Sequence, residues 1–189
     1  MHAMPRNKLS RRARIATAGA ALTAAVAVTA LGAVSANASA PAGAPAAAPV
    51  AAAGTTTTSA HLTIDAATEA AQAALDAAEK ENQRVTVAVV DRNGNTLVTL
   101  RGDGAGPQSY ESAERKAYTA VSWNAPTSQL AERLAQAPNL KDIPGTLFLA
   151  GGVPVTAKNA PIAGIGVAGA PSGALDEKFA AAGAAALAR

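Results

Sequence analysis

Two glutamates stand three positions apart in QSYESAERKAYT, residues 108–119, and this spacing could do chemistry. On a helix, Glu111 and Glu114 would share a face, where their carboxylates could hold one hard cation. The alternative is ordinary surface charge, because Glu111 can pair with Arg115 four positions further on. Asp76 and Glu79 have the same spacing in an earlier stretch. Spacing alone leaves both interpretations open.

The chain has few other groups that bind metals or attack substrates. It contains no cysteine, which excludes disulfides, thiolate metal sites and a thiol nucleophile. Its two histidines are His2 and His61. No serine lies in a nucleophile elbow, and no zinc-binding motif appears. The residues therefore favour a binding protein over a hydrolase.

A GxGxxG pattern at residues 164–169 matches the fingerprint of dinucleotide-binding folds. In those folds a strand ends at the first glycine and a helix opens within the motif. Here Gly164 and Gly166 lie inside a β-branched, apolar run, and the next helical pattern begins later. We expect both to be small residues of a closely packed strand.

Residues 1–38 have the layout of an export signal, with a basic start, an apolar run and an ANA cleavage site at 36–38. The SRR triplet at residues 10–12 is typical of the twin-arginine route. A membrane anchor is the rival interpretation, because the apolar run over 15–34 is long enough to span a bilayer. We expect removal of this segment, and hence a secreted, extracellular protein or one held at the cell surface.

Removing this leader changes the sign of the net charge. The chain has 16 Lys+Arg and 13 Asp+Glu, and five of the basic residues but no acidic residue precede Pro41. The remainder then carries 11 basic and 13 acidic side chains, a net charge of about −2, so a nucleic-acid partner is not expected. Residues 39–60, rich in Ala, Pro and Thr, predict a flexible tether. Residues 61–189 suit one domain.

Apolar periodicity predicts the elements of that domain. Residues 62–82 read as a helix with a buried stripe of Ile64, Ala67, Ala71, Leu75 and Ala78. Residues 84–91 and 95–101 flank an Asn-Gly turn and predict a β-hairpin. Helices are expected over 108–123 and 126–137, a second hairpin with strands over 146–150 and 153–158, and a further strand over 161–169. A last helix follows, capped by a serine at 172.

Consecutive hairpins imply an antiparallel sheet, and helices must cover its apolar faces. The expected fold class is therefore α+β, an antiparallel sheet built from hairpins and covered by about four helices.

Five stretches together resemble the GlcG/HbpS family of small haem-binding or haem-degrading proteins, most of all its secreted branch. They are VAVVDRNGNTLVTLRGDGA at 87–105, AERKAYTAV at 113–121 followed by NAPT, GGVPV at 151–155, and GIGVAGAPSGALDEKFAAAG at 164–183. The resemblance covers nearly all of residues 62–187. It implies an antiparallel sheet wrapped by helices, a homo-oligomer (an octamer in the secreted branch), haem as ligand, and iron released from haem or sensed.

Haem iron is normally held by His, Met, Cys or Tyr. Outside the leader the chain offers only His61, Tyr110 and Tyr118. A buried electron-transfer haem with two histidine ligands, or with one histidine and one methionine, is therefore excluded within one chain. Any haem is expected to be bound weakly, through oxygen, or between subunits.

The resemblance places Thr146 near the haem pocket, where its hydroxyl would ligate ferric iron weakly; alternatively it is an ordinary residue at the start of a strand. Arg115 and Lys116 could pair with haem propionates, or they could be solvated helix charges. Glu111 and Glu114 would hold an iron ion. His61 is either an exposed residue or an iron ligand on a mobile arm reaching its own or another subunit.

These features leave three functions to compare. The first is a secreted haem- and iron-binding oligomer that captures, buffers or senses extracellular haem in oxidative or haem stress and presents that signal to a membrane sensor such as a histidine kinase. The second is an enzyme that degrades or demetallates haem with iron release. The third is a structural exported oligomer without a ligand. We expect the first.

Overall fold

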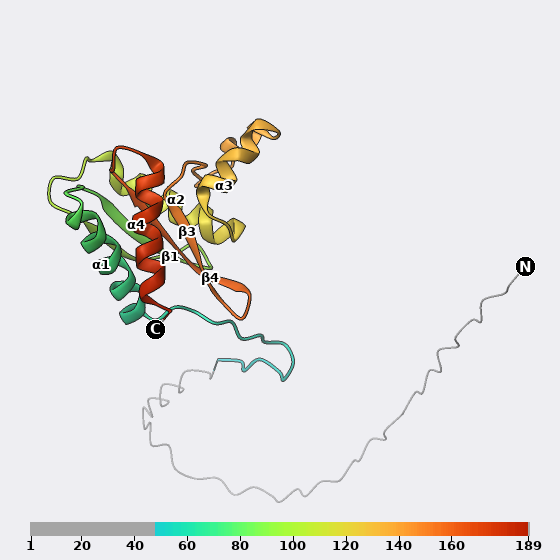
Figure 1. Ribbon diagram of the computed structural model, residues 1–189. Helices are drawn as coiled ribbons and strands as arrows, with labels where there is room; N and C mark the ends of the chain where they lie inside the picture. Colours follow the sequence, from blue (N-terminus) through green and yellow to red (C-terminus); the bar gives the residue numbers. More distant parts are fainter. Residues whose placement is uncertain (1–47, 189) are drawn as a thin grey trace, which may run out of the picture. The chain divides into compact units, whose positions relative to one another are not determined.

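The computed structural model describes residues 48–188, and all its helices and strands belong to a unit that starts at Ala51 (Figure 1). The predicted leader over 1–38 and the first part of the tether lie outside the described residues. Within the described residues no helix has the length and hydropathy needed to cross a membrane. In chain order the main elements are α1 (Ile64–Lys80), β1 (Thr86–Asp91), β2 (Thr96–Arg101), α2 (Gln108–Trp123), α3 (Thr127–Glu132), β3 (Gly152–Ala157), β4 (Ala160–Ala168) and α4 (Gly173–Ala186), with two 3₁₀ helices at 133–135 and 138–142.

The four strands form one antiparallel sheet in the order β2-β1-β4-β3. The β1–β2 hairpin closes where the sequence predicts it, with Gly94 at a φ of 88° and its N–H donating to the Asp91 carbonyl at 3.0 Å. The described residues also form four α-helices, so the predicted α+β class is confirmed.

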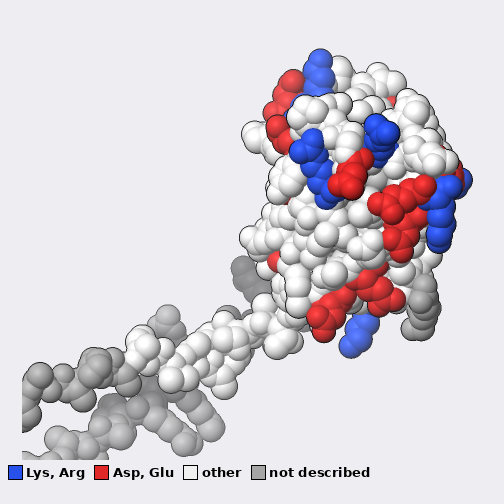
Figure 2. Space-filling model, turned by 90° about the vertical axis from the view of Figure 1, so that its left-hand side faces the viewer, with Lys and Arg blue, Asp and Glu red and all other residues white. Residues whose placement is uncertain are grey.

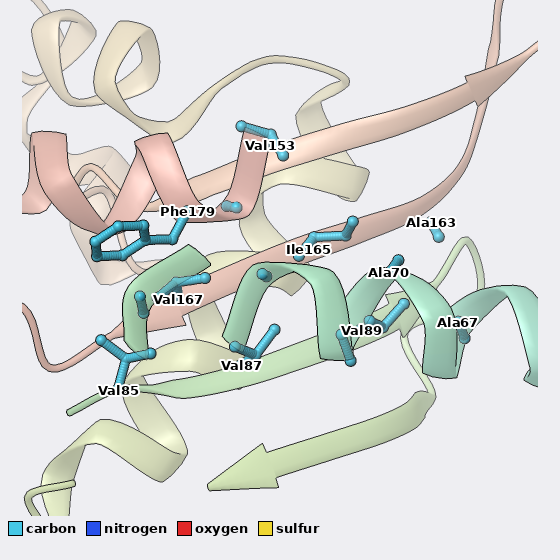
Figure 3. Packing of buried hydrophobic residues seen from close by; sticks show 14 residues of the cluster. Ala67, Ala70, Val85, Val87, Val89, Val153, Ala163, Ile165, Val167 and Phe179 are labelled. Atoms are coloured by element: carbon cyan, nitrogen blue, oxygen red, sulfur yellow. The ribbon is translucent and has the colours of Figure 1, made fainter. Parts of the chain in front are cut away.

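Helices α1 and α4 pack on one face of the sheet, where the main hydrophobic core lies (Figure 3). Alternate apolar residues of the two central strands point into this layer, as the two-residue period of a strand requires. They are Val87 and Val89 of β1 and Ala163, Ile165 and Val167 of β4. The face of α1 that meets them is a run of fully buried alanines, Ala67, Ala70, Ala71, Ala74 and Ala78. The prediction that Ile64 belongs to this stripe is wrong, because that side chain is 57% exposed in the first turn of the helix.

Helix α2 packs on the other face, against the β1 side chains of opposite parity and against β4. A Cβ atom added at Gly164 or Gly166 would overlap the carbonyl oxygens of Ala117 and Ala113, respectively. The two glycines therefore let the helix backbone approach the strand, as expected for a closely packed strand. They lie within β4, and no helix opens between them.

The predicted strand over 146–150 is wrong. The second hairpin is formed by β3 and β4, and residues 146–150 form an irregular segment before β3. Local bonding explains the difference, because the N–H and hydroxyl of Thr146 both donate to the Ile143 carbonyl, at 3.3 and 2.7 Å, and close a turn. Phe148 turns instead toward Trp123, with ring centroids 5.6 Å apart.

Candidate functional site

The outward stripe of α2 carries the candidate residues. Buried small residues of this helix face the sheet, and the helical period places Glu111, Glu114, Arg115 and Tyr118 together on a neighbouring stripe. Glu111 is exposed, whereas Glu114 and Tyr118 are partly buried. The predicted spacing is thus realised on one helix face. The close helix–strand contact fixes the height of this stripe above the sheet.

Both carboxylates of the pair have a partner within the chain. Glu111 and Arg115 approach to 3.6 Å, and their side chains are 77% and 41% exposed. Glu114 accepts a hydrogen bond from the Thr99 hydroxyl at 3.2 Å. In the part of the chain that the structure describes, no three His, Asp or Glu side chains are grouped to hold a metal ion. A cation held here would keep an open coordination sphere filled by water or another ligand.

A surface cavity of about 200 Å³ adjoins this stripe. Glu114, Arg115 and Tyr118 line it together with Val90, Gly94, Thr96 and Gly145. The Tyr118 ring occupies the space between the two glycines, since an added Cβ would lie 2.9 Å from the ring at the first and 3.6 Å at the second. Pockets of roughly 300–1,000 Å³ enclose a drug-sized ligand, so this cavity can hold the edge of a larger planar molecule.

Thr146 lies beside the cavity, next to Gly145. The residue is 3% exposed, and its hydroxyl donates to the Ile143 carbonyl at 2.7 Å. A hydroxyl that donates in this way keeps its lone pairs for a second interaction. The Thr146 carbonyl accepts from the Arg115 guanidinium at 2.8 Å. The structure therefore brings Thr146, Arg115 and both glutamates of the pair into one region.

Lys116 points the other way, into the protein. It is 2% exposed, and its ammonium pairs with Asp176 at 2.8 Å and donates to the Val167 carbonyl at 3.0 Å. Burial raises the pKa of the Asp176 carboxyl, and the neighbouring Lys116 charge offsets only part of that rise. The ammonium is thus committed to a buried ion pair, and the structure does not present it beside Arg115.

His61 lies apart from the carboxylate pair. It is exposed, precedes α1 and hydrogen-bonds through Nε2 to the Ser59 hydroxyl at 2.8 Å. Helices α1 and α2 cover opposite faces of the sheet. Among the residues that the structure describes, His61 is not grouped with the two glutamates at a site that could hold a metal.

Charges of both signs share the visible surface. Figure 2 shows one face of the molecule, on which Asp and Glu side chains are interspersed with Lys and Arg. Exposed groups of opposite sign also form ion pairs, such as Lys178 with Glu81 at 2.5 Å. This face has no extended patch of a single sign.

Sequence reasoning did not find the side chains that support this region. Thr119 is fully buried, donates to the Arg115 carbonyl at 2.7 Å and accepts from the Leu147 N–H at 2.7 Å. Glu177 accepts from the Ser128 N–H and hydroxyl at the start of α3 and from the Gly151 N–H. No sequence signal marks such long-range partners.

Comparison with known proteins places this arrangement among haem-related proteins. The model of a family described as haem degrading protein, HbpS-like, matches residues 62–185. No curated protein matches the chain significantly.

Three solved structures show the extent of the likeness. A Streptomyces reticuli HbpS double mutant, with two glutamates three positions apart changed to aspartate, is 79% identical over 75% of this chain and 97% of that one, with a TM-score of 0.73. The Klebsiella pneumoniae protein ORFY is 26% identical over 70% and 94%, with a TM-score of 0.66. A PduOC–haem complex is 26% identical over 67% and 95%, with a TM-score of 0.62.

Proposed function

The chain belongs to the HbpS-like family of haem degrading proteins, and from this premise we propose that it binds haem and iron. In this proposal the protein captures, buffers or senses haem and iron outside the cell. The observation that carries it is the grouping of Arg115 and Tyr118 at one surface cavity, with Thr146 hydrogen-bonded to Arg115 and two carboxylates on the same helix, in a chain 79% identical to an HbpS structure.

The haem contact is proposed at this cavity because its residues suit the group in kind. The half-exposed guanidinium of Arg115 can form a charge-assisted hydrogen bond with a propionate. The Thr146 hydroxyl and the Tyr118 side chain are oxygen-bearing groups near the cavity. We leave Lys116 out of the haem contact, because its ammonium is committed to Asp176. Since the cavity holds only an edge of a large planar molecule, binding is expected to be loose and exchangeable.

Iron is proposed at Glu111 and Glu114. Carboxylate oxygens suit a hard cation such as ferric iron. In the Streptomyces reticuli double mutant, two glutamates with the same spacing are replaced by aspartate. We take this as support for proposing Glu111 and Glu114 as the iron ligands. In this proposal His61 reaches a metal on another subunit, because its own α2 lies across the sheet.

The wider setting is proposed from the leader and from the family. Export with removal of residues 1–38 would make the protein secreted, and a homo-octamer would present several sites at once. An apolar groove of about 420 Å³, formed by side chains that include Leu62, Val155, Ile162 and Leu187, offers a surface for such assembly. Light scattering on the purified protein tests the octamer. Recovery of a histidine kinase from membranes, with and without haemin, tests the sensor partner.

Haemin titration tests the binding function directly. We expect a saturable change of the Soret band, weakened by Thr146→Ala and by Arg115→Gln. Ferric iron binding, measured separately, should fall in Glu111→Gln/Glu114→Gln. The matched control is Asp76→Asn/Glu79→Gln, which removes an equally spaced pair from α1. A titration equal to that of an unrelated acidic protein would refute the proposal.

A second function is favoured by the description of the family as haem degrading. In that case the protein would open or demetallate the macrocycle and release iron. Incubation with haemin and a reductant or peroxide separates the two functions. Loss of the Soret band with release of iron indicates the enzyme, and a stable spectrum indicates the binder.

A further inference from the structure

The segment that carries Thr146 has little structure of its own. Residues 146–150 are neither helix nor strand, and the Thr146 N–H and hydroxyl bond only within the preceding turn, to Ile143. The position of the Thr146 hydroxyl relative to α2 therefore depends on the contacts that tie this segment to the helix.

Phe148 packs on Trp123 at the end of α2. Two hydrogen bonds complete the connection next to Thr146, and they belong to one closed ring. Arg115 donates through its guanidinium to the Thr146 carbonyl at 2.8 Å. The next N–H, that of Leu147, donates to the Thr119 hydroxyl at 2.7 Å, and this hydroxyl donates back to the Arg115 carbonyl at 2.7 Å. Hydrogen bonds linked in this way polarise and orient one another.

The two ends of the connection differ in their exposure. The Arg115 side chain is 41% exposed and also faces Glu111, so solvent and other charges compete for it. Thr119 is fully buried, and both hydrogen-bonding roles of its hydroxyl are used inside the protein. The rigid half of the ring is therefore the Thr119 half.

We infer that Thr119 is a positioning residue for the haem site, which sets the place of Thr146 through the Leu147 N–H without touching the ligand. This inference rests on the proposed function. It follows from burial, since no ligand can reach Thr119, while its hydroxyl holds the residue next to the proposed oxygen donor. Replacing the hydroxyl with a methyl group leaves the Leu147 N–H without its acceptor, and the segment must shift to satisfy it.

The chain offers a matched control in Thr127. This residue is also fully buried, and its hydroxyl accepts a backbone N–H, that of Gly152, at 2.8 Å. Thr127 is the first residue of α3, and its partner Gly152 is the first residue of β3, shortly after the segment 146–150 ends. A valine at either position removes one buried acceptor of a backbone N–H, so general destabilisation affects both variants, whereas a positioning effect is confined to Thr119.

The experiment compares Thr119→Val, Thr119→Ser and Thr127→Val in haemin titrations, with the absorption and electron paramagnetic resonance spectra of the ferric complex as readouts. Thr119→Val should weaken haemin binding about fivefold or more, the usual scale of coupling between linked sites, and should change the ferric spectrum. Thr119→Ser keeps the hydroxyl and should retain the wild-type haemin affinity and ferric spectrum. Thr127→Val should leave the ferric spectrum unchanged. Urea unfolding of each variant confirms that a folded protein is compared, and Thr119→Ala serves if the valine variant does not fold.

An unchanged spectrum and affinity in Thr119→Val, or an equal change in Thr127→Val, would overturn the inference while leaving haem binding intact. A wild-type protein that fails to bind haemin would instead remove the proposed function, and this inference with it. Residue-resolved hydrogen exchange gives an independent test without ligand. The Leu147 amide should exchange slowly in the wild type and faster in Thr119→Val.

Discussion

The buried ion pair between Lys116 and Asp176 allows the sharpest test of the fold. Their side chains are 2% and 5% exposed, and their charged atoms lie 2.8 Å apart. The pair joins α2 to the first turn of α4, and Asp176 also accepts from the Ala170 N–H at 2.9 Å. Replacing Asp176 with asparagine keeps the size of the side chain but leaves the ammonium without a countercharge.

The expected cost is large because water cannot solvate that ammonium. Removing one partner of a buried pair destabilises proteins by about 3–5 kcal/mol, which is a large part of a typical stability of about 5–15 kcal/mol. With a urea m-value of about 2 kcal/mol/M, the unfolding midpoint of Asp176→Asn should fall by roughly 2 M. The single tryptophan, Trp123, at the end of α2, provides the fluorescence signal.

The pKa direction predicts a different result for the double variant. Since burial raises the pKa of Asp176 by more than the Lys116 charge lowers it, desolvation outweighs the attraction within the pair. Lys116→Met/Asp176→Leu should therefore recover most of the stability or exceed the wild type. Glu81→Gln, which breaks the exposed pair with Lys178, is the control and should cost at most about 1 kcal/mol. A cost below about 1 kcal/mol for Asp176→Asn would refute the buried-pair argument.

Three further perturbations follow from the structure. Gly166→Ala should lower the free energy of unfolding by several kcal/mol or prevent folding, because its Cβ would overlap the α2 backbone; a thermal midpoint within a few degrees of the wild type would contradict this. Desolvation alone would raise the pKa of Asp91, but hydrogen bonds from Asn95 and Asn93 hold this pKa below the ordinary value of 3.8. The ionised carboxylate therefore stabilises the fold above pH 3.8, and this stabilisation is lost as the pH falls through the lowered pKa. Asp91→Asn should flatten the acid side of the stability profile measured by urea unfolding. Glu177→Ala should raise proteolytic cleavage around α3, because the carboxylate accepts from the first turn of that helix; unchanged cleavage would show that α3 is held by packing alone.

The elements that sequence reasoning predicted correctly are those whose signals are local. The β1–β2 hairpin follows from an Asn-Gly turn between two β-branched runs, and its glycine has the positive φ that the turn requires. Ser172 caps α4 by accepting from the Leu175 N–H at 3.2 Å. Each of these signals acts within a few residues, so a sequence window contains all the interacting groups.

The errors arise where a tertiary partner decides the outcome. Residues 146–150 have the composition of a strand, but their hydrogen bonds go to Ile143, Arg115 and Thr119 instead of to a strand. Lys116 reads as helix surface charge, yet its acid partner lies 60 residues away. Of the candidate site, the Glu111–Arg115 contact was predictable because it is an i,i+4 pair, whereas the link from Arg115 to Thr146 spans 31 residues.

The two sides of α2 explain how a rigid helix can serve a loose site. Its inner side meets β4 at glycines, so its backbone cannot move toward or away from the sheet without steric overlap or an empty space. Its outer side carries long, half-exposed side chains over a shallow cavity, where solvent competes for every polar contact. The close packing of α2 on β4 fixes the positions of Arg115 and Thr119. These two residues in turn fix the position of the segment that carries Thr146, through their hydrogen bonds to it. If haem binds at this cavity as proposed, the open outer side should keep binding weak and exchange fast, so that a ligand can enter and leave without unfolding any part of the core.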